Sequence, residues 1–230
     1  MHLFDIICIK NYTEREKLIM KNEFLSKVFK WFGIGLLVTF LVAYFTSTNI
    51  TLLSLIFSGY GYLIIFLLEI VLAVWLSSRI RKMDSGLTKG LYIGYSALTG
   101  LTFSSIFIVY EMSSIIFIFL ATSIIFLIFS ILGKNSKMNL TKLGTYLFVG
   151  LLSIVIINLI NIFIMNNTLD IVLCVIGIII FIGYVYYDIN RIVNYYDDTD
   201  NMAVVGAFNL YLDFINIFLK LLRLFGKKRD

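Results

Sequence analysis

The sequence predicts an all-α integral membrane protein, a bundle of seven spanning helices. Hydrophobic residues make up 60% of its 230 residues, charged residues make up only 14%, and the chain contains no proline. Soluble domains average about half apolar and about a quarter charged residues, so a soluble fold could not hide this much apolar surface. Apolar runs of about 20 residues recur along the chain, and a helix of that length crosses a bilayer.

Six apolar runs bounded by polar residues predict six spanning helices, and a weaker run predicts a seventh. The expected spans are residues 28–45, 59–78, 87–110, 113–132, 143–165, 169–195 and 203–225. Residues 50–58 are apolar but short, so they either extend the second span or lie at the membrane interface. This division leaves 1–27 as an N-terminal head, 28–226 as one membrane domain and 227–230 as a basic tail.

The head is expected to stay on the protein. The first 30 residues mix basic and acidic side chains and lack the short apolar core of a cleavable signal peptide. Met20 is an alternative start of the protein. The net charge of +5 comes from basic residues in short loops beside apolar spans, so we interpret it as an orientation signal and expect no nucleic-acid partner.

The distribution of Lys and Arg predicts the side of the membrane on which each connection lies. The head and the second–third, fourth–fifth and sixth–seventh connections carry basic residues, whereas the alternate connections carry none. Short basic loops favour the cytoplasm, so a cytoplasmic N-terminus is expected. The chain after residue 219 is an exception, since Lys220, Arg223 and residues 227–229 would face outward if 203–225 crossed the membrane. The last segment therefore either re-enters and returns its tail to the cytoplasm, or crosses as a central helix held by packing.

Ionisable residues inside the predicted spans indicate where function lies, because they are costly to place in lipid. Glu69, Asp188 and Asp213 are three such residues. If the sixth helix ends near Tyr195 and the seventh begins near Gly206, each aspartate lies about 10 Å in from the cytoplasmic end. The two aspartates are therefore expected to meet at one depth.

Two asparagines extend this acidic pair along the last helix. Asn209 and Asn216 share a helical face with Asp213, while apolar residues fill the other directions, which favours a helix surrounded by protein. A close pair formed by Asp188 and Asp213 would share a proton and titrate in two steps, which is the behaviour of a pH sensor. Once deprotonated, the pair would coordinate calcium transiently. Because calcium takes about 6–8 oxygens, the two asparagines, backbone carbonyls and water would supply the remaining ligands.

Two arginines at the end of the second span are candidate closing partners for the acidic pair. Arg79 or Arg81 would hold a closed state by pairing with Asp188, although both residues also fit simple anchoring at the membrane surface. Arg191 would satisfy the same carboxylate locally. Two interpretations of Glu69 have equal weight: it is a third carboxylate on an ion pathway, or it forms a hydrogen bond between helices.

Three motifs carry a resemblance to a known family. They are residues 209–226 (NLYLDFINIFLKLLRLFG), 187–192 (YDINRI) and 95–107 (YSALTGLTFSSIF). Each resembles a motif of the Bax-inhibitor, or transmembrane Bax-inhibitor-motif, family. The resemblance implies seven helices with the last one central, a pH-sensing pair at Asp188 and Asp213, and a pH-dependent calcium leak. It also implies the inner membrane of a bacterium, because bacterial relatives reside there.

Other functions compete with a calcium leak. A non-conducting interaction or stress-regulatory protein would use the aspartates only to lock two helices together, and a proton-coupled exchanger would use them to carry protons. An intramembrane aspartyl protease would use them as general acid and base, but Asp213 follows Leu-Tyr-Leu rather than the Gly-x-Gly of such proteases. The only histidine is His2, in the head, which argues against serine protease or metalloprotease chemistry. We therefore expect no enzyme activity and no cofactor, with calcium as the permeant ion.

Overall fold

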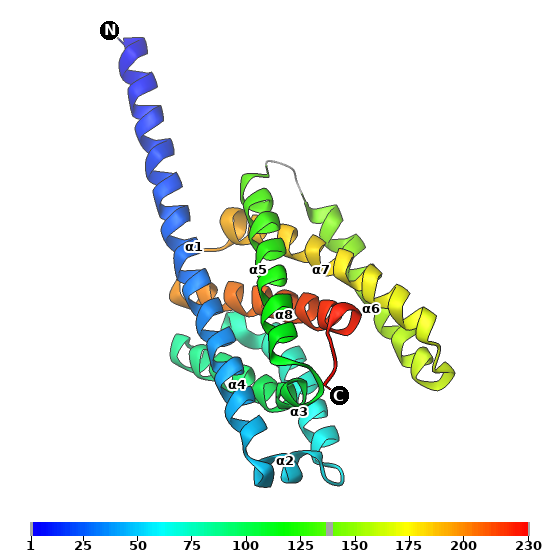
Figure 1. Cartoon of the computed structure of the whole chain (residues 1–230). Coiled ribbons are helices and arrows are strands. Elements are labelled where there is room, and N and C mark those ends of the chain that lie inside the picture. The colour runs from blue at the N-terminus through cyan, green and yellow to red at the C-terminus, as the bar shows by residue number, and fades with distance from the viewer. Residues whose placement is uncertain (1, 137–139, 230) are drawn as a thin grey trace.

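The chain forms a bundle of α-helices in the computed structural model (Figure 1). The structure describes residues 2–136 and 140–229, without the side chains of residues 2–15, 17, 18 and 81. The helices are α1 (His2–Thr48), α2 (Ile50–Phe57), α3 (Gly61–Arg79), η1 (Ile80–Lys82), α4 (Ser85–Val109), α5 (Met112–Asn135), α6 (Thr141–Ile164), α7 (Asn167–Tyr195) and α8 (Asp200–Phe225). Among the described residues, seven of these helices are long and apolar enough to cross a membrane, which confirms the predicted fold class.

The structure agrees with most predicted span boundaries within about three residues. One difference is α1, which continues through the expected head as a single helix, so the head and the first span are not separate elements. The other is the short apolar segment 50–58, which forms its own helix α2 and does not extend the next span.

Side-chain caps set where several spans begin. Asp84 accepts a hydrogen bond from the Gly86 amide at 2.9 Å before α4, and Asn166 accepts one from the Leu169 amide at 3.0 Å before α7. Thr199 does the same for α8. The first amides of a helix have no partner within the helix, so these polar residues between apolar runs stabilise the helix starts.

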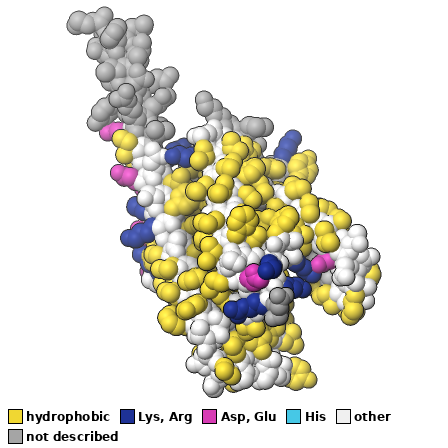
Figure 2. All heavy atoms as spheres, in the orientation of Figure 1, with side chains coloured by type: hydrophobic (Ala, Val, Ile, Leu, Met, Phe, Trp, Pro, Cys, Tyr) yellow, Lys and Arg dark blue, Asp and Glu magenta, His cyan; other side chains and the backbone are white. Residues whose placement is uncertain are grey.

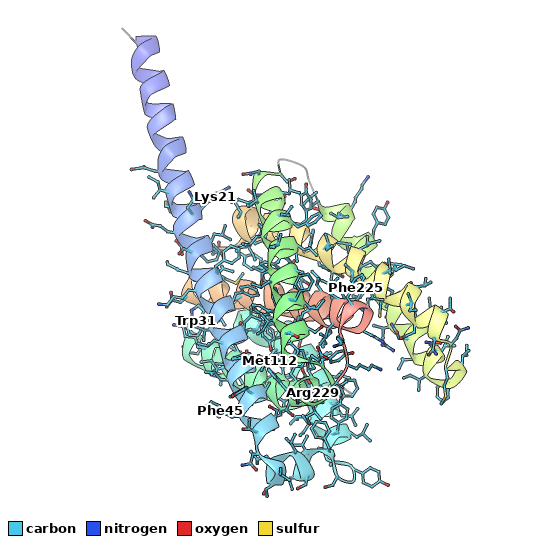
Figure 3. All side chains as sticks on the ribbon, viewed as in Figure 1. Lys21, Trp31, Phe45, Met112, Phe225 and Arg229 are labelled. Atoms are coloured by element: carbon cyan, nitrogen blue, oxygen red, sulfur yellow. The ribbon has the colours of Figure 1, made fainter. Side chains whose placement is uncertain are left out.

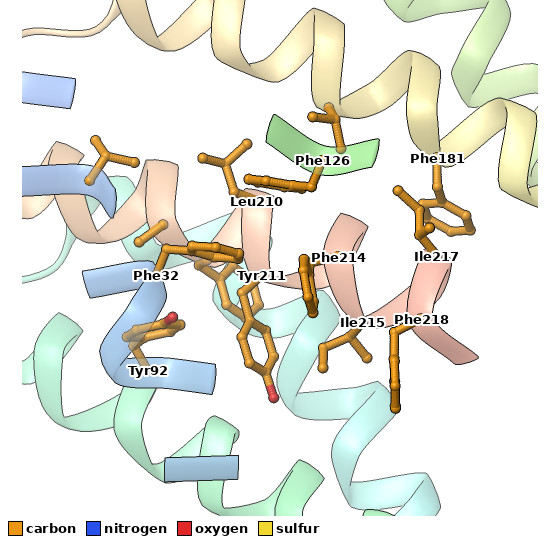
Figure 4. Close-up of a cluster of buried hydrophobic side chains, with 14 of the residues drawn as sticks. Phe32, Tyr92, Phe126, Phe181, Leu210, Tyr211, Phe214, Ile215, Ile217 and Phe218 are labelled. Carbon is orange, nitrogen blue, oxygen red and sulfur yellow. The ribbon is translucent and has the colours of Figure 1, made fainter. Parts of the chain in front are cut away.

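Helix α8 lies at the centre of the bundle, as predicted. It contacts α1, α4, α5 and α7, and 72% of its most apolar stretch is buried, compared with 6% for α3. Figure 4 shows its buried side chains leaving on opposite sides, with Tyr211, Ile215 and Phe218 extending away from the side of Leu210 and Ile217. Helix α6 packs on α7.

The connections between the spans gather at two opposite ends of the bundle. At the α7–α8 end, the Asn201 amide donates to the backbone carbonyls of Ile80 and Met83, both at 3.3 Å, which joins the α3–α4 connection to the start of α8. Asn190 of α7 donates to the Ser136 carbonyl at 2.9 Å, which joins the end of α5 to the same region.

At the α4–α5 end, the chain beyond α8 pairs with the connection between α4 and α5. The Glu111 amide donates to the Lys227 carbonyl at 3.0 Å, and the Arg229 amide donates to the Val109 carbonyl at 2.9 Å. Helix α8 therefore begins at one end of the bundle and finishes at the other, so the re-entrant interpretation is wrong.

Two of the five basic side chains that break the charge pattern form ion pairs with acidic side chains. Lys227 forms an ion pair with Glu111 at 2.6 Å, and Arg223 pairs with Asp170 at the start of α7. Figure 2 shows basic and acidic side chains beside one another on a surface that is otherwise largely apolar. Acidic partners at the α4–α5 end thus offset part of this basic charge. The preference of Lys and Arg for cytoplasmic loops would instead place the charge at the α7–α8 end.

Candidate functional site

The structure brings Asp188 of α7 and Asp213 of α8 together at the contact between the two helices. The two side chains are only 7% and 5% exposed, and their carboxylates interact electrostatically. Both helices are apolar on most of their length, so the pair lies in a surrounding that does not solvate charge well.

One oxygen of Asp213 is buried and, among the residues that the structure describes, has no hydrogen-bond partner. Buried polar groups in folded proteins are almost always paired, and an unpaired buried carboxylate is expensive. A proton, a water molecule or a cation on this oxygen would lower that cost. The site is therefore suited to exchanging such species at the α7–α8 contact.

Tyr184 also belongs to this site, although it is not among the site residues predicted from the sequence. It is partly buried on α7 and lies within electrostatic reach of both carboxylates. Its position four residues before Asp188 places both side chains on one face of α7, and that spacing was the signal available in the sequence.

The two predicted asparagines flank Asp213 with their amide nitrogens already engaged. Asn209 donates to the Tyr196 hydroxyl at 3.2 Å, and Asn216 donates to the Leu212 carbonyl of its own helix at 2.8 Å. Within the described part of the chain, no group of three or more His, Cys, Asp or Glu side chains gathers into a metal site.

Glu69 lies at a different helix contact. Its carboxylate accepts hydrogen bonds from Thr99 at 2.8 Å and from Thr102 at 3.2 Å, which joins α3 to α4. This arrangement matches the helix-contact interpretation of Glu69. The pathway interpretation stays a prediction.

A second polar cluster, the hydroxyl cluster of Thr39, Ser96 and Tyr211, occupies another face of α8. Tyr211 is fully buried, and its hydroxyl lies 2.6 Å from the Thr39 hydroxyl, which donates to the Ser96 carbonyl at 2.9 Å. Two residues along a helix turn the side chain by about 200°, so Tyr211 and Asp213 point to nearly opposite sides of α8. The hydroxyls of Thr39 and Tyr211 are paired with each other, whereas one carboxylate oxygen of Asp213 has no partner among the described residues.

The predicted closing arginines lie at the α7–α8 end. Arg79 ends α3 with an exposed side chain, and the side chain of Arg81 lies outside the described residues. The backbone of η1, which contains residue 81, contacts α8. The closing role of either arginine stays a prediction.

Basic residues occupy the other half of the α7–α8 contact. The Lys220 ammonium lies 6.0 Å from the ring centre of Phe181, and its side chain rests on Gly177, where an added Cβ would lie 2.8 Å from Nζ. The Arg223–Asp170 ion pair follows toward the α4–α5 end. Gly177 therefore leaves room for a lysine side chain between two membrane helices.

Comparison with known proteins identifies the relatives of this chain. A family model described as "Inhibitor of apoptosis-promoting Bax1" matches residues 21–230. The inner membrane protein YbhL of Escherichia coli K12 is 38% identical over 217 residues, covering 90% of this chain and 93% of YbhL. An uncharacterized protein of Borreliella burgdorferi is 40% identical over 225 residues, 94% of this chain and 97% of the relative. An uncharacterized membrane protein of Streptococcus pyogenes is 32% identical over 229 residues, 94% of this chain and 96% of the relative.

Proposed function

Because this chain belongs to the Bax-inhibitor family, we propose that it is a pH-sensitive leak for calcium across a bacterial inner membrane. The observation that carries the proposal is the buried Asp213, with one unpartnered carboxylate oxygen beside Asp188. In this proposal the two carboxylates sense protons and attract the permeating cation. The process is passive and involves no bond chemistry and no cofactor.

The sharing of a proton between the two aspartates gives the leak its pH dependence. Two neighbouring buried carboxylates repel each other when both are ionised, so they titrate as one coupled pair. Loss of negative charge on Asp188 would release a closing arginine, Arg79 or Arg81, while the remaining charge would still attract a cation. The leak should therefore open as the pH falls from about 8 to about 6.

The orientation that we propose follows from the charges at the two ends. The α7–α8 end carries the basic α3–α4 and α5–α6 connections, so it faces the cytoplasm together with the N-terminus. The aspartate pair then lies in the half of the α7–α8 contact that is nearer the cytoplasm, with Asp213 close to the middle of α8. The name of the Escherichia coli relative supports the inner membrane as the location.

Calcium flux into liposomes tests the proposal. Purified full-length protein would be reconstituted, and uptake would be followed with an enclosed calcium dye between about pH 5 and about pH 8. The native chain should show a flux that increases on acidification, and the Asp188→Asn/Asp213→Asn chain should lose the pH response. Asp84→Asn is the matched control, because it removes a carboxylate from the same end of the bundle and keeps an N-cap.

Two outcomes would count against the leak. No flux above that of empty liposomes at any pH would favour a non-conducting interaction protein, in which the aspartates only hold α7 and α8 together. An unchanged pH response in the double variant would remove the aspartate pair from the sensor. Thermal unfolding of each variant in detergent shows whether it is folded before its flux is interpreted.

A further inference from the structure

Two adjoining cavities lie between helices toward the α4–α5 end of the bundle, away from the aspartate pair. The larger, of about 450 Å³, lies between α1, α4, α5 and α8 and is lined almost entirely by apolar side chains. The smaller, of about 400 Å³, contains Arg229, Ser47 and Thr48. Phe107 and Met112 line both cavities, so the two lie side by side: an apolar lobe, and a second lobe that is called the polar lobe here because it contains Arg229 and two hydroxyl side chains.

The apolar lobe opens toward the surface that lipid would cover. Leu37 of α1 and Ile116 and Leu120 of α5 line it and are 58%, 52% and 55% exposed. Phe214 and Phe218 of the central helix form its buried wall. Its volume lies within the range of ligand sites in proteins, and its mouth faces the bilayer interior.

The polar lobe offers one fixed cation. Arg229 donates through Nη1 to the Phe107 carbonyl at 3.2 Å, and its backbone amide donates to the Val109 carbonyl at 2.9 Å. Figure 3 shows Arg229 and Met112 close together at this end of the molecule. A guanidinium has five N–H donors, so most remain for an anion, and its geometry suits a phosphate. The Ser47 and Thr48 hydroxyls already donate to the carbonyls of Tyr44 and Phe45.

The order of the lobes along α1 matches the order of the parts of a lipid. Residues 33–43 of α1 contribute to the apolar lobe and residues 44–48 to the polar lobe. From residue 33 to residue 48 the helix rises about 22 Å. One leaflet with its headgroups is also about 20–22 Å thick, half of a bilayer of about 40–45 Å. The two lobes together therefore extend along α1 over about the thickness of one leaflet, with the charge at one end.

We propose that this site binds one phospholipid of the bilayer, with an acyl chain in the apolar lobe and the phosphate on Arg229. A purely apolar ligand would leave the arginine unused, and a free phosphate would leave the apolar lobe empty. The site is separate from the aspartate pair, so the inference goes beyond the proposed leak and holds whether or not the chain conducts calcium.

Native mass spectrometry of the full chain in detergent, titrated with phosphatidylglycerol, tests the proposal. Ile116→Trp should fill the apolar lobe and weaken the tightest bound lipid by about tenfold. Phe117→Trp is the matched control, since Phe117 is the next residue of α5, is 71% exposed and does not line the cavity. Arg229→Gln should weaken binding by about threefold, and Lys228→Gln should leave it unchanged.

Equal lipid affinity in Ile116→Trp and Phe117→Trp would overturn the site. Weakening by Ile116→Trp without any effect of Arg229→Gln would indicate an apolar ligand and overturn the phospholipid assignment. A dimer mass that disappears in Ile116→Trp would assign the cavity to a second copy of the chain instead. Leu37→Trp fills the same lobe from α1 and replaces Ile116→Trp if the latter lowers the unfolding temperature in lipid-free detergent.

Discussion

The two halves of the contact between α7 and α8 carry opposite charge. The half near the α7–α8 end contains Asp188 and Asp213, whereas the half near the α4–α5 end contains Lys220 and the Arg223–Asp170 ion pair. A buried acid with an unpaired oxygen attracts a cation, and a lysine in the same helix contact repels it. If ions move along this contact, the acidic half senses pH and the basic half limits the rate.

The largest expected effect comes from neutralising the acidic half alone. Asp213→Asn should abolish the pH response of calcium flux, reducing a difference of about tenfold between about pH 6 and about pH 8 to none, because the remaining carboxylate no longer titrates in a pair. Asp170→Asn, which removes a carboxylate from the basic half, should retain the response. The comparison fails if both variants respond alike in the liposome assay.

A smaller effect is expected from removing the lysine of the basic half. Lys220→Met should raise calcium flux about fivefold at every pH without moving the pH at which flux is half-maximal. A unit charge several ångströms from a cation contributes about 1 kcal/mol or more at an effective dielectric constant of about 20. Lys228→Gln, an exposed change in the tail, is the control. Unchanged flux in Lys220→Met would place the ion route elsewhere.

The hydroxyl cluster sharpens the comparison from the other face of α8. Tyr211→Phe removes a hydroxyl bonded to Thr39 at 2.6 Å and should lower the free energy of unfolding by about 1 kcal/mol, since the Thr39 hydroxyl loses a partner. The pH response of the flux should stay as in the native chain. A lost response would extend the sensor from the α7–α8 contact to the hydroxyl cluster.

The smallest effect is expected at the glycine under Lys220. Gly177→Ala should lower the free energy of unfolding by less than about 1 kcal/mol, because the flexible lysine end can move away from the new methyl group. The loss should disappear in a Lys220→Ala background, where there is no side chain to displace. Chemical unfolding of the four chains in detergent measures this coupling, and a loss independent of Lys220 would show that the glycine serves another contact.

Much of the fold was predictable because the relevant physics is local to each segment. Apolar length predicts each span, and the cost of a carboxylate in lipid singled out Asp188, Asp213 and Glu69. The two aspartates do interact, but the spacing that predicted their meeting was wrong for Asp213: α8 begins at Asp200 and not near Gly206, so Asp213 lies 13 residues from its helix start whereas Asp188 lies 7 from its helix end. Tyr184, the threonine partners of Glu69 and the resting place of Lys220 on Gly177 were not predicted, because each depends on which faces of two helices meet.

The two ends of the bundle show where charge counting stops being sufficient. The basic loops gather at one end of the bundle, which fits a common cytoplasmic side, but the basic tail opposes this pattern, so the sequence left the path of the last segment open. The pairing of Lys227 with Glu111 and of Arg223 with Asp170 placed that tail at the α4–α5 end. A rule based on net loop charge does not include partners from other loops.

The sequence by itself determined the membrane class, the seven spans and the residues able to titrate inside them, since hydropathy and charge act on each segment before it packs. Only the tertiary structure decided that Asp213 leaves one oxygen without a partner among the described residues while Tyr211, on the same helix, is hydrogen-bonded to Thr39. It also decided that α8 runs from one end of the bundle to the other and that a cavity containing Arg229 adjoins the apolar cavity. These features depend on contacts between residues that are far apart in the chain. Only the packing of the helices brings those residues together.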